Sequence, residues 1–189
     1  MLSLICATLV GHLTPEPQPE FLVRNGDQLV STHAVELRLD APGLRLVSPA
    51  HRSARFNNVP FDISLSAFLG EESAIMVHAE QVADGSGAAN YSRFPETDWP
   101  INGFRDRPPQ CLMVTEDIAR NEHDIAWLAA AGFDPVGAVW IDQYFITDPT
   151  YNDEVVISLM IKARTCDGDA PDVSDLKSQL SVRMHHNYP

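Results

Sequence analysis

Hydrophobic and polar residues alternate most clearly between residues 61 and 82. Two such runs flank Gly70-Glu71-Glu72-Ser73, a pattern that predicts a β-hairpin. We expect the apolar odd-numbered positions of both strands to face one core, which requires a loop with an odd number of residues. The opposite face of the hairpin would then carry Asp62, Ser64, Ser66, His78 and Glu80.

Shorter apolar runs predict further strands at 21–24, 28–31, 34–39, 44–47 and 111–115. Asn25-Gly26-Asp27 joins the first two in a tight turn, because Asn and Gly tolerate positive φ. Long runs at 136–146 and 154–164 predict a second hairpin with a longer loop. Residues 48–58 show no period, so we expect a loop there.

Two segments have helical spacing. The first begins at Thr115 as N-cap, carries an apolar stripe from Ile118 to Leu128 and ends at Gly132. The second covers residues 173–184, with Val173, Leu176, Leu180 and Met184 on one face. The sequence therefore predicts an α+β fold: a mainly antiparallel sheet of about seven to nine strands built from hairpins, with one or two helices packed on one face.

The first 20 residues differ from the rest of the chain. An apolar run at residues 2–10 precedes the proline-rich spacer Pro15-Glu-Pro-Gln-Pro19. This run has the length of a signal segment, although no Lys or Arg precedes it and no clean cleavage site follows. We expect an exported protein, periplasmic or secreted, with residues 21–189 forming a single domain; the alternative is a cytoplasmic protein whose fold includes residues 2–10.

Residues 83–110 have no periodicity and form a connection far longer than usual. Aromatic side chains in it provide apolar area to bury, which argues against disorder. We expect this segment to cover one face of the sheet or to wall a binding site. The candidate binding residues are Tyr91, Phe94, Trp99 and Phe104.

The chain is acidic, with 13 Lys and Arg against 26 Asp and Glu and a net charge of −13. Such a charge repels phosphate backbones and anionic lipid. We therefore expect neither nucleic acid nor an anionic membrane surface as a partner. A protein or a small molecule is the expected ligand. Composition does not predict the oligomeric state.

Three cysteines are present, and none lies in a Cys-x-x-Cys pair. A structural zinc site lacks the chelating pairs that it needs. Cys111 and Cys166 lie at the expected edges of two strands, and we predict that they form a disulfide; two unrelated buried thiols are the alternative.

His78 and Glu80 are the strongest candidates for chemistry, because residues two apart on a strand project from the same face. They could transfer protons, or hold a metal if further ligands arrived by folding. No spacing supplies such ligands, and no nucleotide-binding motif occurs, so we expect no metal and no cofactor. Asp148, Asn152, Asp153 and Glu154 are expected to be turn formers in the loop of the second hairpin.

Three functions follow from these features. The first is a non-catalytic binding or accessory protein, exported, with a recognition surface or pocket under residues 83–110. The second is a metal-assisted or acid/base enzyme centred on His78 and Glu80. The third, which rests on size and charge, is an acidic cytoplasmic chaperone or oligomeric adaptor.

Overall fold

A computed structural model describes residues 19–184, and these form two antiparallel sheets with three short helices. The four-stranded sheet has the order β1-β2-β3-β12. Its strands are β1 (Leu22–Asn25), β2 (Gln28–Ser31), β3 (Leu37–Asp40) and β12 (Ser181–Met184). The expected N-terminal signal segment and its spacer lie almost wholly outside the described residues.

The large sheet has eight strands in the order β4-β6-β7-β11-β10-β9-β8, and β5 also pairs with β6. Its strands are β4 (Arg45–Leu46), β5 (Ala50–Phe56), β6 (Val59–Leu69), β7 (Ser73–Val82), β8 (Glu96–Thr97), β9 (Phe104–Val114), β10 (Gly137–Thr147) and β11 (Asp153–Ala163). The prediction of an antiparallel, sheet-dominated α+β fold is confirmed. The predicted single sheet of about seven to nine strands is wrong, because the described residues form 12 strands divided between two sheets.

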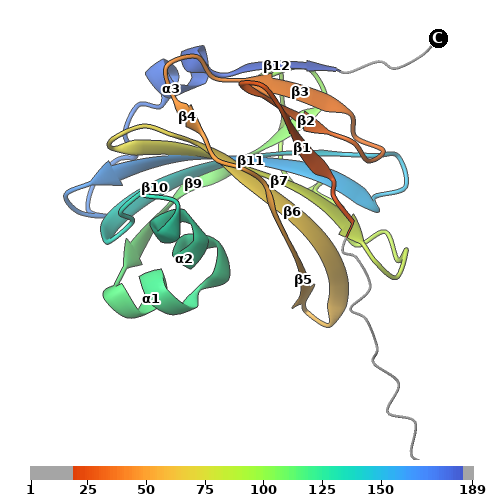
Figure 1. Cartoon of the computed structure of the whole chain (residues 1–189), viewed down its shortest axis with the longest axis horizontal. Coiled ribbons are helices and arrows are strands. Elements are labelled where there is room, and N and C mark those ends of the chain that lie inside the picture. The colour runs from red at the N-terminus through yellow and green to blue at the C-terminus, as the bar shows by residue number, and fades with distance from the viewer. Residues whose placement is uncertain (1–18, 185–189) are drawn as a thin grey trace, which may run out of the picture.

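The small sheet packs on one face of the large sheet, as Figure 1 shows. Leu29, Leu37 and Leu39 from the small sheet join Val77 and Ile157 of the large one in the main core. On the other face of the large sheet, α1 (Glu116–Asn121) and α2 (His123–Ala130) lie below β9 and β10 (Figure 1). The third helix, α3 (Ser174–Gln179), instead places Leu176 in the core between the sheets.

The β6–β7 hairpin is present, but its predicted register is wrong. Leu69 pairs with Ala74, so four residues separate the pair and odd positions of β6 meet even positions of β7. His78 therefore lies opposite Leu65, not beside Ser64 or Ser66. Because apolar side chains occupy both faces of β6, in two different cores, alternation on one strand could not set the register.

Three segments were predicted with the wrong structure. Residues 50–56 form β5 and not a loop. Asn57 and Asn58 turn the chain with φ of 50° and 69°, which is the left-handed geometry of a tight hairpin. The alternation that usually reveals a strand is absent because β5 is an edge strand with no buried residue.

The segment 83–110 is also shorter than predicted, because β9 already begins at Phe104. Pro108 and Pro109 are atypical of a strand interior, so the sequence predicts a strand only from residue 111. They oppose Asp142 at a bulge, where the pairing between β9 and β10 shifts. Proline is tolerated at such a position because its missing amide hydrogen is not needed for a ladder bond.

The predicted C-terminal helix covers only Ser174–Gln179, and the chain then continues as β12, which pairs with β3. Leu180 and Val182 are both buried, which is the spacing of a strand. The first predicted helix is divided in two at Glu122, whose backbone is extended. Its predicted cap is confirmed: the Thr115 hydroxyl accepts a hydrogen bond from the Ile118 amide at 3.2 Å.

Candidate functional site

The two faces of β7 have different surroundings. Ile75, Val77 and Ala79 point into the core between the sheets. Met76, on the opposite face, belongs to the second core with Leu128 of α2. His78 and Glu80 continue that second face beyond the helices, as strand alternation requires.

Two adjoining cavities lie on this helix-bearing face of the large sheet. The larger has a volume of about 630 Å³ and lies between β5, the α1–α2 pair and the sheet. The smaller, of about 400 Å³, lies between the sheet, the β5–β6 turn and residues 88–94. Phe56, His78 and Gln143 line both cavities, so we treat the two as one groove.

His78 is held at the centre of the groove by carboxylates on both sides. Its Nδ1 lies 3.2 Å from Glu80 Oε1, and its Nε2 lies 3.8 Å from Asp124 Oδ2. Burial lowers the pKa of His78, but the hydrogen bond and charge of Glu80, with the charge of Asp124, outweigh it and raise the pKa above the ordinary value. The imidazole therefore favours its protonated form.

Asp124 is itself fixed from across the larger cavity. Its Oδ1 accepts hydrogen bonds from Nη2 of Arg52 at 2.8 Å and from Nε at 3.1 Å. Arg52 belongs to β5 and Asp124 to α2, and both side chains are largely buried. The ion pair thus joins two walls of the groove.

Glu154 lies opposite Glu80 on the neighbouring strand β11 and is almost fully buried. The Tyr91 hydroxyl donates a hydrogen bond to Glu154 Oε1 at 3.2 Å. Burial and the charge of Glu80 raise the pKa of Glu154 well above the ordinary range, and the hydrogen bond from Tyr91 offsets this only in part. Glu154 therefore favours its neutral carboxylic acid form.

A row of polar side chains crosses the floor of the groove. Nη1 of Arg107 on β9 donates to Gln143 Oε1 at 2.9 Å, and Gln143 Nε2 donates to the Ser158 hydroxyl at 3.1 Å. Apolar side chains lie on both sides of this row, including Met160 in the larger cavity and Phe145 in the smaller. The groove is therefore amphipathic.

The predicted binding residues separate into two pairs. Tyr91 and Phe94 line the smaller cavity and stack on Phe145, with ring centroids 4.2 and 5.9 Å away respectively. Phe104 is fully buried in the core between the sheets, and Trp99 packs against that core. The structure thus brings Tyr91 and Phe94 to His78 and Glu80, and holds Trp99 and Phe104 in a different environment.

Some groove residues were missed because their partners come from distant parts of the chain. Glu154 was predicted both as the first residue of a strand and as a turn former, and it is the second residue of β11. Strand alternation with Val156 and Ser158 was the available signal. Asp148, by contrast, does act as a turn former, since its carboxylate accepts hydrogen bonds from the amides of Thr150, Asn152 and Asp153. Nothing in the sequence pointed to Asp124, Arg52 or Arg107.

His33 and His51 each lie close to one polar group. His33 Nε2 lies 2.9 Å from the Glu154 backbone carbonyl, and His51 Nδ1 lies 2.8 Å from the Ser64 hydroxyl. Within residues 19–184, no group of three or more His, Cys, Asp or Glu side chains is placed to hold a metal ion.

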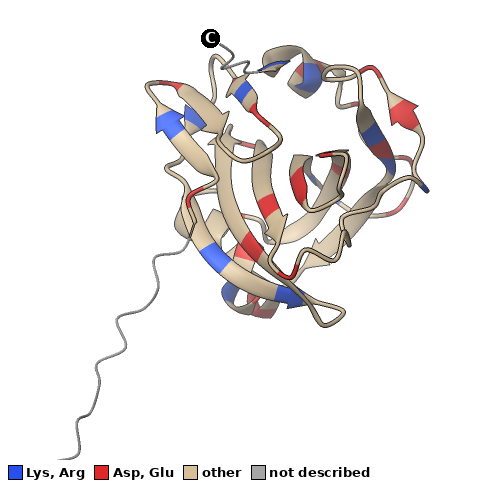
Figure 2. Cartoon of the chain, turned by 90° about the vertical axis from the view of Figure 1, so that its right-hand side faces the viewer, with Lys and Arg blue, Asp and Glu red and all other residues tan. Residues whose placement is uncertain are grey.

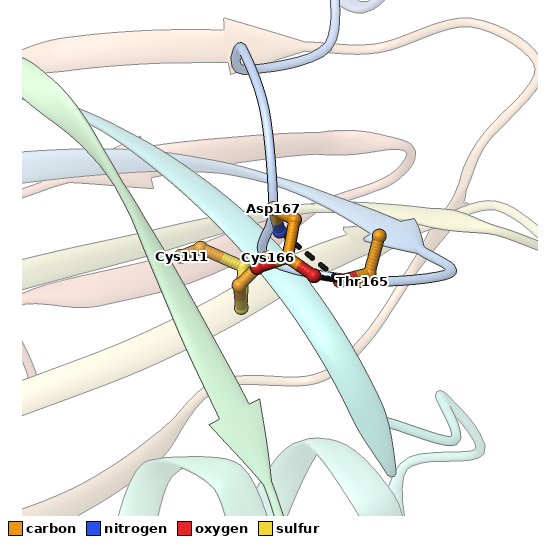
Figure 3. Close-up of a disulfide and its surroundings, with 4 residues drawn as sticks. All are labelled: Cys111, Thr165, Cys166 and Asp167. Carbon is orange, nitrogen blue, oxygen red and sulfur yellow. Dashed lines mark hydrogen bonds between the residues drawn. A yellow bond between two sulfur atoms is a disulfide. The ribbon is translucent and has the colours of Figure 1, made fainter.

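Cys111 and Cys166 form a disulfide with Cα atoms 5.5 Å apart, as the sequence predicts (Figure 3). The bond ties β9 to the segment that follows β11. Such a bond fits an oxidising, extracellular compartment. No helix in the described part of the chain is long and apolar enough to cross a membrane.

Comparison of the chain with models of protein families, with curated proteins and with solved structures gives no match.

Proposed function

We propose that this chain is a binding protein that holds a small molecule in the groove on the helix-bearing face of the large sheet. The observation that carries the proposal is the pair of adjoining cavities, of about 630 and 400 Å³, which share Phe56, His78 and Gln143 as walls. Volumes of this size are typical of small-molecule sites. Apolar side chains beside fixed polar groups, as in this groove, are also found in such sites.

The polar side chains of the groove are held in fixed orientations, which supports the binding of a ligand there. Arg52 and Asp124 are held by two mutual hydrogen bonds, and Gln143 is held from both ends by Arg107 and Ser158. Polar side chains that are already oriented lose little freedom when a ligand binds. The groove thus needs little rearrangement to accept its ligand.

We further propose that the protein works outside the cytoplasm. The Cys111–Cys166 disulfide supports this, because cytoplasmic thiols are kept reduced. The same bond is an argument against the cytoplasmic chaperone or adaptor hypothesis. A basic partner protein stays an alternative occupant for the acidic surface of the chain.

Dye binding tests the proposal directly. N-phenyl-1-naphthylamine is neutral and fluoresces strongly only in apolar surroundings, so the protein should enhance its emission. Ile125→Trp fills the larger cavity from α2 and should weaken the dye affinity at least about tenfold. Val136→Trp, at an exposed position outside both cavities, is the matched control and should bind like the parent. Absence of binding by the parent, or equal loss in both variants, would contradict a groove site.

The second candidate is acid/base catalysis at His78. Its geometry supports this, because Glu80 orients Nδ1 while Nε2 has no hydrogen-bond partner among the described residues. The groove also brings a third titratable group, Asp124, to the imidazole. Turnover of p-nitrophenyl octanoate that is lost in His78→Gln, with dye binding retained, would favour the enzyme. Binding without turnover would favour the binding protein.

A further inference from the structure

The groove carries side chains of both charge signs. Four of the 13 basic residues line its cavities, namely Arg52, Arg55, Arg93 and Arg107, and four acidic residues line them as well, namely Glu80, Glu122, Asp124 and Glu154. Basic and acidic residues are also interspersed along the ribbon on the side of the molecule that Figure 2 shows. What distinguishes the groove arginines is therefore how each one is paired.

Three of these arginines make no salt bridge. Within residues 19–184, Arg55, Arg93 and Arg107 lack one, whereas Arg52 pairs with Asp124. Arg55 lines the larger cavity and donates to the Asn58 carbonyl. The Arg93 guanidinium lies over the Phe94 ring, 4.7 Å from its centroid. Arg107 donates to the neutral Gln143. Arg93 and Arg107 both line the smaller cavity without a salt bridge to Glu80 or Glu154, which line it as well.

Two buried polar atoms in the same wall also lack partners. Neither Glu154 Oε2 nor His78 Nε2 has a hydrogen-bond partner in the described part of the chain. Both residues line the smaller cavity, and Glu154 is only 1% exposed. Buried polar atoms are rarely left unsatisfied, so a group in the cavity is expected to pair with them.

The protonation of these two groups decides which kind of partner they need. The pKa of Glu154 is raised by burial and by the charge of Glu80, so Oε2 carries a proton to donate. Burial lowers the pKa of His78, but the carboxylates of Glu80 and Asp124 outweigh it and raise the pKa, and the protonated imidazole would donate from Nε2 as well. Acceptor oxygens on the ligand would therefore pair with both groups.

We propose that the ligand is an amphipathic carboxylate, with its charged head between Arg93 and Arg107 in the smaller cavity and its apolar tail in the larger one. This inference rests on the proposed binding function. Arginine suits a carboxylate because its planar guanidinium can donate two parallel hydrogen bonds. Met76, Ile125 and Met160 line the region assigned to the tail.

A single charge on the ligand fits better than a double one. Glu80 lies in the same wall as Glu154, and Asp124 lies across His78 from it. These carboxylates would repel a second negative charge, as a phosphate monoester carries. A carboxylate gains from both arginines while keeping that repulsion small.

Three ligands that have eight-carbon chains and different head groups test whether the groove prefers a carboxylate. Each is used to displace N-phenyl-1-naphthylamine from the protein. We expect octanoate to displace the dye at concentrations at least about tenfold lower than 1-octanol, with octylammonium weaker still. Arg107→Gln and Arg93→Gln should each weaken octanoate about tenfold and leave 1-octanol unchanged. The control Arg120→Gln removes the same charge from an exposed position on α1 and should have no effect.

The outcomes separate this inference from the function on which it rests. Dye binding with equal or better displacement by octylammonium or 1-octanol overturns the carboxylate and leaves the binding function in place. The carboxylate inference is also overturned if the protein binds the dye and none of the three ligands displaces it. If the parent protein fails to bind the dye, the proposed function itself fails.

Discussion

Glu80 and Glu154 face each other across β7 and β11, and both are at least nine-tenths buried. Like charges at directly opposed strand positions destabilise a sheet. The two residues have different partners, since Glu80 contacts the imidazole of His78 and Glu154 accepts from the Tyr91 hydroxyl. Burial and the charge of Glu80 raise the pKa of Glu154, so Glu154 favours its neutral form.

Glu154→Gln should stabilise the protein increasingly as pH rises. The pKa of Glu154 is raised in the folded state, so its contribution to stability is complete below the unfolded value of about 4.3 and is lost as pH rises through the folded value. Glutamine does not titrate. We expect a gain of about 2 kcal/mol at pH 8, since one pKa unit corresponds to about 1.4 kcal/mol.

Urea unfolding at pH 4 and pH 8 measures this difference. Glu71→Gln, an exposed change in the loop between β6 and β7, removes an equal charge and serves as the control. Parallel pH profiles for the parent protein and Glu154→Gln would contradict a buried neutral carboxyl group.

Glu80→Gln should lower the pKa of His78. The hydrogen bond and charge of Glu80 oppose the effect of burial, so their removal should shift the titration midpoint of His78 to lower pH. NMR titration of the imidazole resonances measures this, and His78→Gln identifies the His78 signal.

The raised pKa of His78 predicts that the stability contributed by this residue falls as pH rises. Because its folded pKa is raised, the stability that it contributes is complete below about pH 6.5 and is lost as pH rises through the folded value. His78→Gln should therefore cost most below pH 6.5. A cost that grows with pH would show that the imidazole is neutral in the fold.

Removal of the disulfide by Cys111→Ala with Cys166→Ala should destabilise the protein by about 4 kcal/mol, the chain-entropy estimate for a bridge between residues 55 apart. Thermal unfolding of the parent with and without a reductant checks this. The reductant should lower the melting temperature of the parent protein and leave the double variant unchanged. A reductant effect of equal size in both proteins would show that other groups respond.

The Arg52–Asp124 pair should contribute about 1 kcal/mol of coupling, because its side chains are only 21% and 30% exposed. A double-mutant cycle with Arg52→Gln and Asp124→Asn measures it. The exposed pair Arg120–Glu116 on α1 is the matched comparison, at 68% and 78% exposure, and should couple by less than about 0.5 kcal/mol. Equal coupling at both pairs would argue against a special role for the pair in joining β5 to α2.

The local sequence pattern was sufficient to predict elements that are defined by their own residues. The β6–β7 and β10–β11 hairpins, the Thr115 cap and the disulfide were all predicted from the sequence. Each depends on a strong apolar run, on a capping side chain or on a pair of cysteines with no other role. These are interactions between near neighbours or between residues of a rare type.

Only the tertiary structure decided which faces are inside and what meets in the groove. Both faces of the large sheet bury apolar residues, so alternation on one strand could not tell which face of β7 pairs with which face of β6. The β5 and β12 strands are defined by pairing with distant partners rather than by their own pattern. Asp124 reaches His78 from α2, Arg52 reaches Asp124 from β5, and Glu154 faces Glu80 from β11. The raised pKa values of His78 and Glu154 arise from burial and from the proximity of charged groups. Those two quantities exist only after the chain has folded.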